Sequence, residues 1–315
     1  MCHHKGLIIT VTINPAIDRT ITVDRLAFED RAYILSSADT PGGRGINAAS
    51  VIHSFGGETR AILPAGGSSG KRFQDALKKC GFPVTVVPIH NQVRTNLTIT
   101  DRHGLTVKLN ERGPELTKPE VADIEKAVKS VLKGAGWLML CGSLPPGVKP
   151  DFYAKLIRAA RRAGVRTLLD TDGEALPRGI EAGPTVVSPN QEEAERLLDT
   201  ALITRSHTLE AVERMQQMGA ESVVLSLGSR GAIGSFDGAL FEAVPPVVDA
   251  RCPIGAGDAM SAAFLWALEK HEPRETALRW GVAAGTASAM QPGMKFASFE
   301  DTREVFERVD VRRVD

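Results

Sequence analysis

A single carboxylate, Asp258, follows directly behind a run of small residues in the stretch PIGAGDAMSAAF (253–264). Met260, Phe264 and Leu268 recur at intervals of four residues, which predicts a helix that begins inside the glycine-rich run. Glycine also lets a bound group approach the backbone closely. The spacing therefore puts a lone acid at the start of a helix, where a ligand can reach it.

The backbone amides of Gly255, Ala256 and Gly257 would lie at the N-terminus of this helix. Unpaired N–H groups and the helix dipole make such a place an anion site, and a phosphate bound there would stand beside Asp258. The alternative is that Asp258 only caps the helix, which would stabilise it by ~1 kcal/mol. The segment by itself does not decide between the two interpretations.

Two other glycine-rich stretches fail as nucleotide motifs. PAGGSSGKRF (64–73) has Ala65 and Arg72 where a P-loop needs glycine and Ser or Thr. PGGRGINAAS (41–50) has Ala48 where the dinucleotide-binding turn has its third glycine. These departures argue against a P-loop enzyme and a nicotinamide dehydrogenase.

The elements that must position Asp258 follow from the apolar pattern. Short β-rich runs alternate with helical patterns, and the continuously apolar strands indicate a parallel sheet with helices on both faces. The strands are expected at 6–13, 136–142, 166–171, 184–190 and 222–228, and the helices near 44–55, 70–80, 119–132, 151–163, 191–198, 208–218, 257–270 and 274–290.

Two segments, 17–40 and 92–110, break this rhythm because they alternate apolar and polar residues with no helix between them. Such alternation is typical of strands with one solvated face, so we expect a small antiparallel lid on the main sheet. No linker, low-complexity tract or repeat divides the chain, which predicts one domain over residues 1–315.

Taken together, several collinear motifs resemble the ribokinase-like, or PfkB, family of carbohydrate kinases. The resemblance runs from about residue 7 to residue 300 and is carried by TINPAID (12–18), GGRGINAA (42–49), VRTNLTI (93–99), CGSLPPGVKPDFY (141–153), DTDGEAL (170–176), SPNQEEAE (188–195), VVLSLGSRGA (223–232) and PIGAGDAMSAAF. It implies an α/β fold with a doubly wound, mainly parallel sheet and a small β-strand lid. It also implies phosphorylation of a sugar hydroxyl by ATP.

Within the family, ILPAGGSSGKRF (62–73) and GEAL (173–176) are most similar to the minor type of 6-phosphofructokinase. This implies that fructose 6-phosphate is converted to fructose 1,6-bisphosphate. Fructose 1-phosphate, tagatose 6-phosphate and unphosphorylated fructose are the alternative acceptors. A sugar-phosphate or nucleotide binding protein without turnover is the alternative of another class.

The resemblance also assigns roles residue by residue. In the phosphoryl-transfer centre Asp258 would accept the proton of the attacking hydroxyl, and the amides of Gly255, Ala256 and Gly257 would form the anion hole. The sugar hydroxyls would contact Asp18, Gly42, Gly43 and Asn47. The sugar phosphate would contact Arg94, Lys108, Arg31 and Ser143. ATP would lie against Asn190, Ser226, Gly228 and Gly231. Glu193 would contribute to the binding of Mg²⁺.

Each of these roles has a plainer alternative. Acids are favoured in any first helical turn, so Asn190 and Glu193 are also consistent with an ordinary helix start. Glycine pairs between strands are common turns, and exposed lid strands often carry Arg and Lys for solubility.

Three residues depart from the family pattern. Arg44 stands where Lys or Gly is common, Ser188 replaces the lysine of KPN, and Pro253 replaces a threonine. The missing lysine removes a positive charge expected near the ATP phosphates, unless Arg44 or Arg230 substitutes for it.

The bulk composition limits the partners. With 38 basic and 38 acidic residues the formal net charge is zero, so no overall attraction to nucleic acid or to an anionic membrane is expected. The apolar run near the N-terminus is too short to span a membrane, and four scattered cysteines without a CxxC pair fit a reducing cytosol. The edge or the apolar face of the lid predicts a homodimer.

Overall fold

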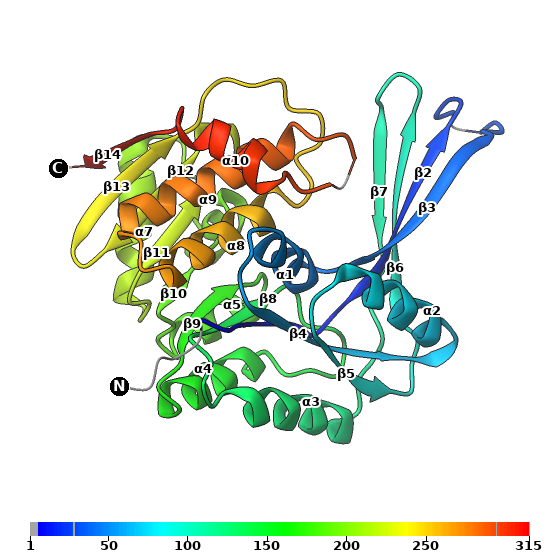
Figure 1. Ribbon diagram of the computed structural model, residues 1–315, viewed down its shortest axis with the longest axis horizontal. Coiled ribbons are helices and arrows are strands. Elements are labelled where there is room, and N and C mark those ends of the chain that lie inside the picture. Colours follow the sequence, from blue (N-terminus) through cyan, green and yellow to red (C-terminus); the bar gives the residue numbers. More distant parts are fainter. Residues whose placement is uncertain (1–5, 28, 294, 315) are drawn as a thin grey trace.

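Figure 1 shows a body of helices packed on one large sheet, with a separate group of strands projecting from it. This computed structural model describes residues 6–27, 29–293 and 295–314. The predicted α/β class and mainly parallel sheet are confirmed. In these three ranges no helix is both long and apolar enough to cross a membrane.

The main sheet has ten strands in the order β14-β13-β12-β11-β10-β9-β8-β1-β4-β5. All neighbours from β5 to β11 pair in parallel, and β12, β13 and β14 extend one edge in antiparallel pairs. The strands are β1 (Ile8–Thr12), β4 (Thr59–Gly66), β5 (Val84–Ile89), β8 (Trp137–Cys141), β9 (Arg166–Asp170), β10 (Val186–Val187), β11 (Val223–Ser226), β12 (Ala232–Phe236), β13 (Ala239–Val244) and β14 (Asp310–Val314).

Alternation of side chains along the central strands explains why helices cover both faces. Ile9 and Leu138 are fully buried in one core cluster, whereas Ile8 and Trp137 are buried in another. Because successive side chains of a strand point to opposite faces, an uninterrupted apolar strand needs apolar cover on each side.

The helices divide between these two faces. The face of Ile9 packs against α3 (Lys118–Val131), α4 (Phe152–Arg162), α5 (Ala175–Ile180), α6 (Gln191–Leu198) and α7 (Arg205–Gln217). The opposite face packs against α1 (Arg44–Ser54), α2 (Gly67–Leu77), α8 (Ala256–Glu269), α9 (Arg274–Ala289) and α10 (Phe299–Phe306).

Every helix predicted from the periodicity is present within a few residues of its expected bounds. The prediction missed β4, β5 and the antiparallel edge β12 to β14. β4 and β5 contain proline, and polar or charged residues interrupt β12, β13 and β14, so the apolar pattern of these strands differs little from that of loops.

The predicted lid is a separate four-stranded sheet in the order β3-β2-β6-β7. Its strands are β2 (Ala16–Val23), β3 (Ile34–Gly42), β6 (Arg94–Asp101) and β7 (Thr106–Asn110). The expectation of a wholly antiparallel lid is wrong, because β2 and β6 pair in parallel. Since β2 follows β1 and β6 follows β5, both leave the body at the same edge and run outward side by side (Figure 1).

Candidate active site

The polar residues singled out in the sequence gather where the carboxyl ends of the parallel strands meet the base of the lid. The ends of β1, β8 and β9 lie here, together with the N-termini of α1, α6 and α8. Ligands of open α/β sheets bind at this edge because the strands end there and helices begin.

Helix α8 begins as the glycine-rich run predicts. Gly255 is its N-cap and adopts a left-handed conformation, with φ of 80°, that favours glycine. A side chain at Gly257 would meet nothing within 4 Å, so the first turn is open to an approaching group. The amide of Ala256, however, donates to the carbonyl of Pro253 at 3.2 Å, so of these three amides only those of Gly255 and Gly257 are left without a backbone partner among the described residues.

Asp258 does not cap this helix, so the capping interpretation is wrong. The carboxylate lies in the first turn of α8, and its Oδ2 accepts a hydrogen bond of 2.7 Å from Nδ2 of Asn47 on α1. The cap position belongs to Gly255, which makes no side-chain cap bond. Asp258 is therefore held by a tertiary contact to α1, and its Oδ2 stays near the N-cap residue Gly255.

The surroundings of Asp258 favour its protonated form. Burial raises the pKa of Asp258 to about 7; the charge of Asp170 adds to the rise, whereas the Asn47 hydrogen bond and Arg44 oppose it. A carboxylate whose pKa lies close to neutral is a better proton acceptor than an ordinary surface acid.

Asp18 is the second buried acid of the site, 7% exposed, on β2 at the base of the lid. Its Oδ1 accepts from Nδ2 of Asn96, the residue opposite it on β6, at 2.9 Å. Burial raises the pKa of Asp18, and the Asn96 bond and Arg94 counteract the rise. A Cβ at Gly42 would stand 1.8 Å from Oδ2, so glycine is needed there to admit the carboxylate.

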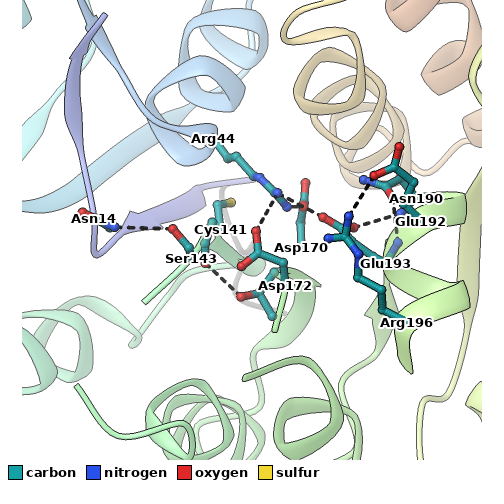
Figure 2. Close-up of polar contacts among 12 residues, drawn as sticks. Asn14, Arg44, Cys141, Ser143, Asp170, Asp172, Asn190, Glu192, Glu193 and Arg196 are labelled. Carbon is teal, nitrogen blue, oxygen red and sulfur yellow. Dashed lines mark hydrogen bonds and ion pairs between the residues drawn. The ribbon is translucent and has the colours of Figure 1, made fainter. Parts of the chain in front are cut away.

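Arg44 joins the acids at the ends of the strands (Figure 2). From α1 its Nη1 donates to Asp170 at 2.7 Å, and its Nη2 donates to both Asp172 and Glu193 at 3.0 Å. Burial would lower the pKa of Arg44, but the surrounding carboxylates, Asp170 foremost, outweigh it and raise the pKa. The guanidinium therefore stays charged and links β9 to α6.

Asn190 and Glu193 form a capping box at the start of α6. Oδ1 of Asn190 accepts from the amide of Glu193, and Oε2 of Glu193 accepts from the amide of Asn190, both at 2.9 Å. Asn190 and Glu193 therefore do stabilise the start of α6, as the ordinary helix-start interpretation expects. Burial raises the pKa of Glu193, and Arg44 counteracts this rise.

The donor set around Glu193 fits a hydrated magnesium ion better than a directly bound one. Both oxygens of Glu193 already accept a hydrogen bond, yet each keeps a lone pair that can accept from a metal-bound water. Among the described residues no three metal-binding side chains form a ready-made cage.

The predicted nucleotide turn follows β11. Ser226 ends this strand and bridges to Asn190, and a 3₁₀ turn (Gly228–Arg230) leads to Gly231. A Cβ at Gly228 would meet only open space, whereas one at Gly231 would stand 2.0 Å from the carbonyl oxygen of Ala243. Gly231 is therefore required by the packing of β13, and Gly228 leaves the turn accessible.

The basic residues predicted for a sugar phosphate are only partly brought together. Arg94, at the base of the lid, donates to the carbonyls of Asn14 and Glu111, and Ser143 accepts from Nδ2 of Asn14 at 3.4 Å. Lys108 is exposed midway along β7, and Arg31 is exposed beyond the far ends of β2 and β3. Within one chain Arg31 does not reach the other three residues.

Sequence reasoning missed several residues of this cluster. Asp170 and Asp172 accept hydrogen bonds from Arg44, and Asn96 donates to Asp18. Nδ2 of Asn14 donates to Ser143 and to the carbonyl of Arg112, and so connects Ser143 with the loop after β7. The available signal was position, because Asp170 ends the buried parallel strand β9, and Asp172 and Asn14 come two residues after β9 and β1.

The comparisons with known proteins agree with this geometry. The sequence description of the pfkB family carbohydrate kinases matches residues 11–301. The chain belongs to the pfkB family of carbohydrate kinases. The resemblance and the class of ATP-dependent kinase predicted from the motifs are thereby confirmed.

Three relatives place the kinase within its family. ATP-dependent 6-phosphofructokinase isozyme 2 of Escherichia coli is 33% identical over 302 residues, which are 95% of this chain and 97% of the relative. A 1-phosphofructokinase of Vibrio cholerae is 24% identical and covers 96% of each chain. The tetrameric inhibited form of phosphofructokinase-2 from Escherichia coli superposes with a TM-score of 0.90 at 32% identity, covering 96% of this chain and 98% of that one.

The Asn47 bond gives a test of how the site sets the proton affinity of Asp258. Replacing Asn47 by Ala removes a donor that stabilises the carboxylate, so the pKa of Asp258 should rise further above about 7. Carboxyl ¹³C chemical shifts followed against pH would measure it.

Asn91→Ala is the matched control, since Asn91 is exposed and donates to the carbonyl of Glu115. It should leave the titration of Asp258 unchanged. An unchanged or lower pKa in Asn47→Ala would contradict the role given to this hydrogen bond.

Proposed function

We propose that this kinase transfers the γ-phosphoryl group of ATP to a ketose phosphate, with fructose 6-phosphate as acceptor and fructose 1,6-bisphosphate as product. One observation carries the proposal. Asp258 is held by Asn47 next to the backbone amides of Gly255 and Gly257, which have no backbone partner among the described residues, so a proton acceptor and an anion site lie side by side.

The chemistry needs few reactive groups. Phosphoryl transfer passes through a loose transition state, so the protein mainly positions the reactants and stabilises charge on the transferred group. The amides at the start of α8 stabilise that charge, and Asp258 takes the proton of the attacking hydroxyl. Because its pKa is about 7, a large fraction is ionised at neutral pH while it remains a competent base.

The sugar would lie against the base of the lid. Asp18 and Asn47 are both largely buried and present a carboxylate and an amide to neighbouring hydroxyls, and Gly42 and Gly43 allow the backbone to come close. Arg94 faces the same region with its charge, and its Nε has no partner among the described residues. A buried guanidinium nitrogen without a partner favours an anionic substituent, here the sugar phosphate, with Ser143 beside it.

ATP would lie across the start of α6 and the turn after β11, against Asn190, Ser226, Gly228 and Gly231. Magnesium, when bound with ATP, neutralises phosphate charge and orients the phosphates. Glu193 would hold its hydration waters. Negative charge exceeds positive charge in the site, so a polyanionic nucleotide requires added positive charge. The five carboxylates belong to Asp18, Asp170, Asp172, Glu193 and Asp258, and the two guanidinium groups to Arg44 and Arg94.

Other acceptors and another class remain as alternatives to be tested. Fructose 1-phosphate and tagatose 6-phosphate would use the same phosphate contacts, whereas fructose would leave Arg94 unused. A binding protein without turnover would keep the fold and the ligands, but it would not need the raised pKa of Asp258.

The lid supports a further proposal, that the kinase is a homodimer whose lids cover each other. Its outer strands β3 and β7 are edges of the lid sheet, and both are exposed along most of their length. The lid also exposes large apolar side chains, among them Ile34 at 63% and Leu109 at 52%. Unpaired edges with apolar side chains find cover against a second copy.

The proposed reaction is tested by ADP release with Mg-ATP and, separately, fructose 6-phosphate, fructose 1-phosphate, tagatose 6-phosphate and fructose. We expect the highest kcat/KM with fructose 6-phosphate. Asp258→Asn should lower kcat by ~10²–10⁴-fold, because the proton acceptor is lost while its shape is kept. Thermal stabilisation by ligands without ADP release would instead favour the binding protein.

The phosphate pocket is tested at Arg94. Arg94→Gln should lower kcat/KM for the phosphorylated ketose by ~10–10²-fold, because a charge-assisted hydrogen bond to phosphate is lost, and should leave any turnover of fructose unchanged. Arg102→Gln, an exposed arginine in the turn between β6 and β7, is the control. Equal losses with phosphorylated and neutral sugars would refute the pocket.

The homodimer is tested by light scattering at micromolar concentration. The wild-type protein should give twice the mass of one chain, and Ile34→Lys should give the mass of one, because a charge on the apolar lid face cannot be covered. Ile203→Lys, at a residue 79% exposed outside the lid, should remain a dimer. A monomeric wild-type protein would end this proposal.

A further inference from the structure

Three carboxylates converge on one guanidinium beside the proposed transfer centre. Oδ2 of Asp172 and Oε1 of Glu193 lie 3.0 Å from the same nitrogen of Arg44, and Asp170 lies 2.7 Å from the other. The side chains of Asp170 and Glu193 are only 8% and 6% exposed. Figure 2 shows the Arg44 side chain reaching between them from α1.

Removing this guanidinium would leave an arrangement that is costly without a cation. Two largely buried carboxylates and a third beside them would repel one another in a region of low dielectric. Carboxylate oxygens that point at one small volume are also what a divalent cation prefers as ligands. Arg44 therefore supplies among these acids the positive charge that a divalent ion could also supply.

Position 188 supplies no positive charge that could replace Arg44. Ser188 is buried, and its hydroxyl shares a 3.0 Å hydrogen bond with that of Ser261 on α8. Arg230, the other candidate cation, is exposed and donates to the side chain of Gln191, the first residue of α6. Of the two arginines that could substitute for the missing lysine, only Arg44 lies among the acids near Asp258.

The guanidinium still has donors to offer. Arginine carries five N–H groups, and the three bonds to Asp170, Asp172 and Glu193 use three of them. The other two make no hydrogen bond to the described residues, and 30% of the side chain is exposed. Arg44 can therefore donate to a phosphate oxygen without releasing its carboxylates.

We propose that Arg44 is a tethered cation of the transfer centre. In the nucleotide-free protein it keeps free divalent metal from binding between Asp170, Asp172 and Glu193, and it donates its remaining N–H groups to the nucleotide phosphates. The second part rests on the proposed kinase function, and the first part does not.

Mn²⁺ binding to the full-length protein without nucleotide tests the first part. The electron paramagnetic resonance signal of free Mn²⁺ would be followed in titrations of wild type, Arg44→Ala, Arg44→Gln and Arg44→Lys. Arg44→Ala and Arg44→Gln should bind one Mn²⁺ at least ~10-fold more tightly than wild type, because the carboxylates lose their cation. Arg44→Lys, which keeps the charge, should resemble wild type.

Two further variants separate this effect from a general change in charge. Asp172→Asn in the Arg44→Ala protein should abolish the gain, since it removes one of the proposed ligands. Arg303→Ala, at an exposed arginine on α10 that pairs with Glu300, should bind as wild type does. Equal Mn²⁺ affinity of wild type and both neutral variants, or tight binding by wild type, would overturn the inference.

Calorimetry with ADP in the presence of EDTA tests the second part without turnover. Arg44→Ala should weaken metal-free ADP binding by ~10-fold or more, and Arg44→Lys should retain most of it. Equal ADP affinities would overturn this role. Turnover by the wild-type protein tests the proposed function separately. If the wild type is inactive but Arg44→Ala and Arg44→Gln bind Mn²⁺ more tightly, the kinase function is refuted and the role of Arg44 in excluding metal is retained.

Discussion

Mutual repulsion of carboxylates is the constraint around which the site is organised. Asp18, Asp170, Glu193 and Asp258 are all wholly or partly shielded from water, and burying such charges without partners is costly. Each accepts a hydrogen bond from a side chain outside its own element: Asp18 from Asn96 on β6, Asp170 and Glu193 from Arg44 on α1, and Asp258 from Asn47 on α1. Helix α1 thus holds acids of β9, α6 and α8 in one place.

This dependence explains how distant segments of the chain form one site. The parallel strands deliver Asp170 and the loops after β1 and β8 to a common edge, and the first turns of α1, α6 and α8 face that edge. Hydrogen bonds from Asn47 and Arg44 then fix the distances between elements that share no backbone pairing. A change in α1 therefore affects the proton affinity of Asp258 as well as the position of Glu193.

Much of this arrangement could be predicted from the sequence, and the rest depends on packing. The periodicity after Gly257 gave the helix of Asp258, and the alternation in 17–40 and 92–110 gave the lid, because both signals are local. The partner of Asp258 was not predictable, since Asn47 lies 211 residues away and nothing near Asp258 identifies it. The parallel pairing of β2 and β6 was missed for the same reason. Asp170 and Asp172 differ, because their position at the end of β9 was a local signal that was not used.

The lid projects from the body like a lever whose base lies beside the proposed sugar subsite. Its parallel seam runs from the pair Ala16 and Arg94 at the body to Val23 and Asp101 at the outer end, and Asp18 lies near the start of this seam. When a lever turns, points near the pivot travel little while the free end sweeps a wide arc. The residues proposed to hold the sugar therefore lie where a turn of the lid about its base would displace them least, and such a turn would displace the exposed outer end most.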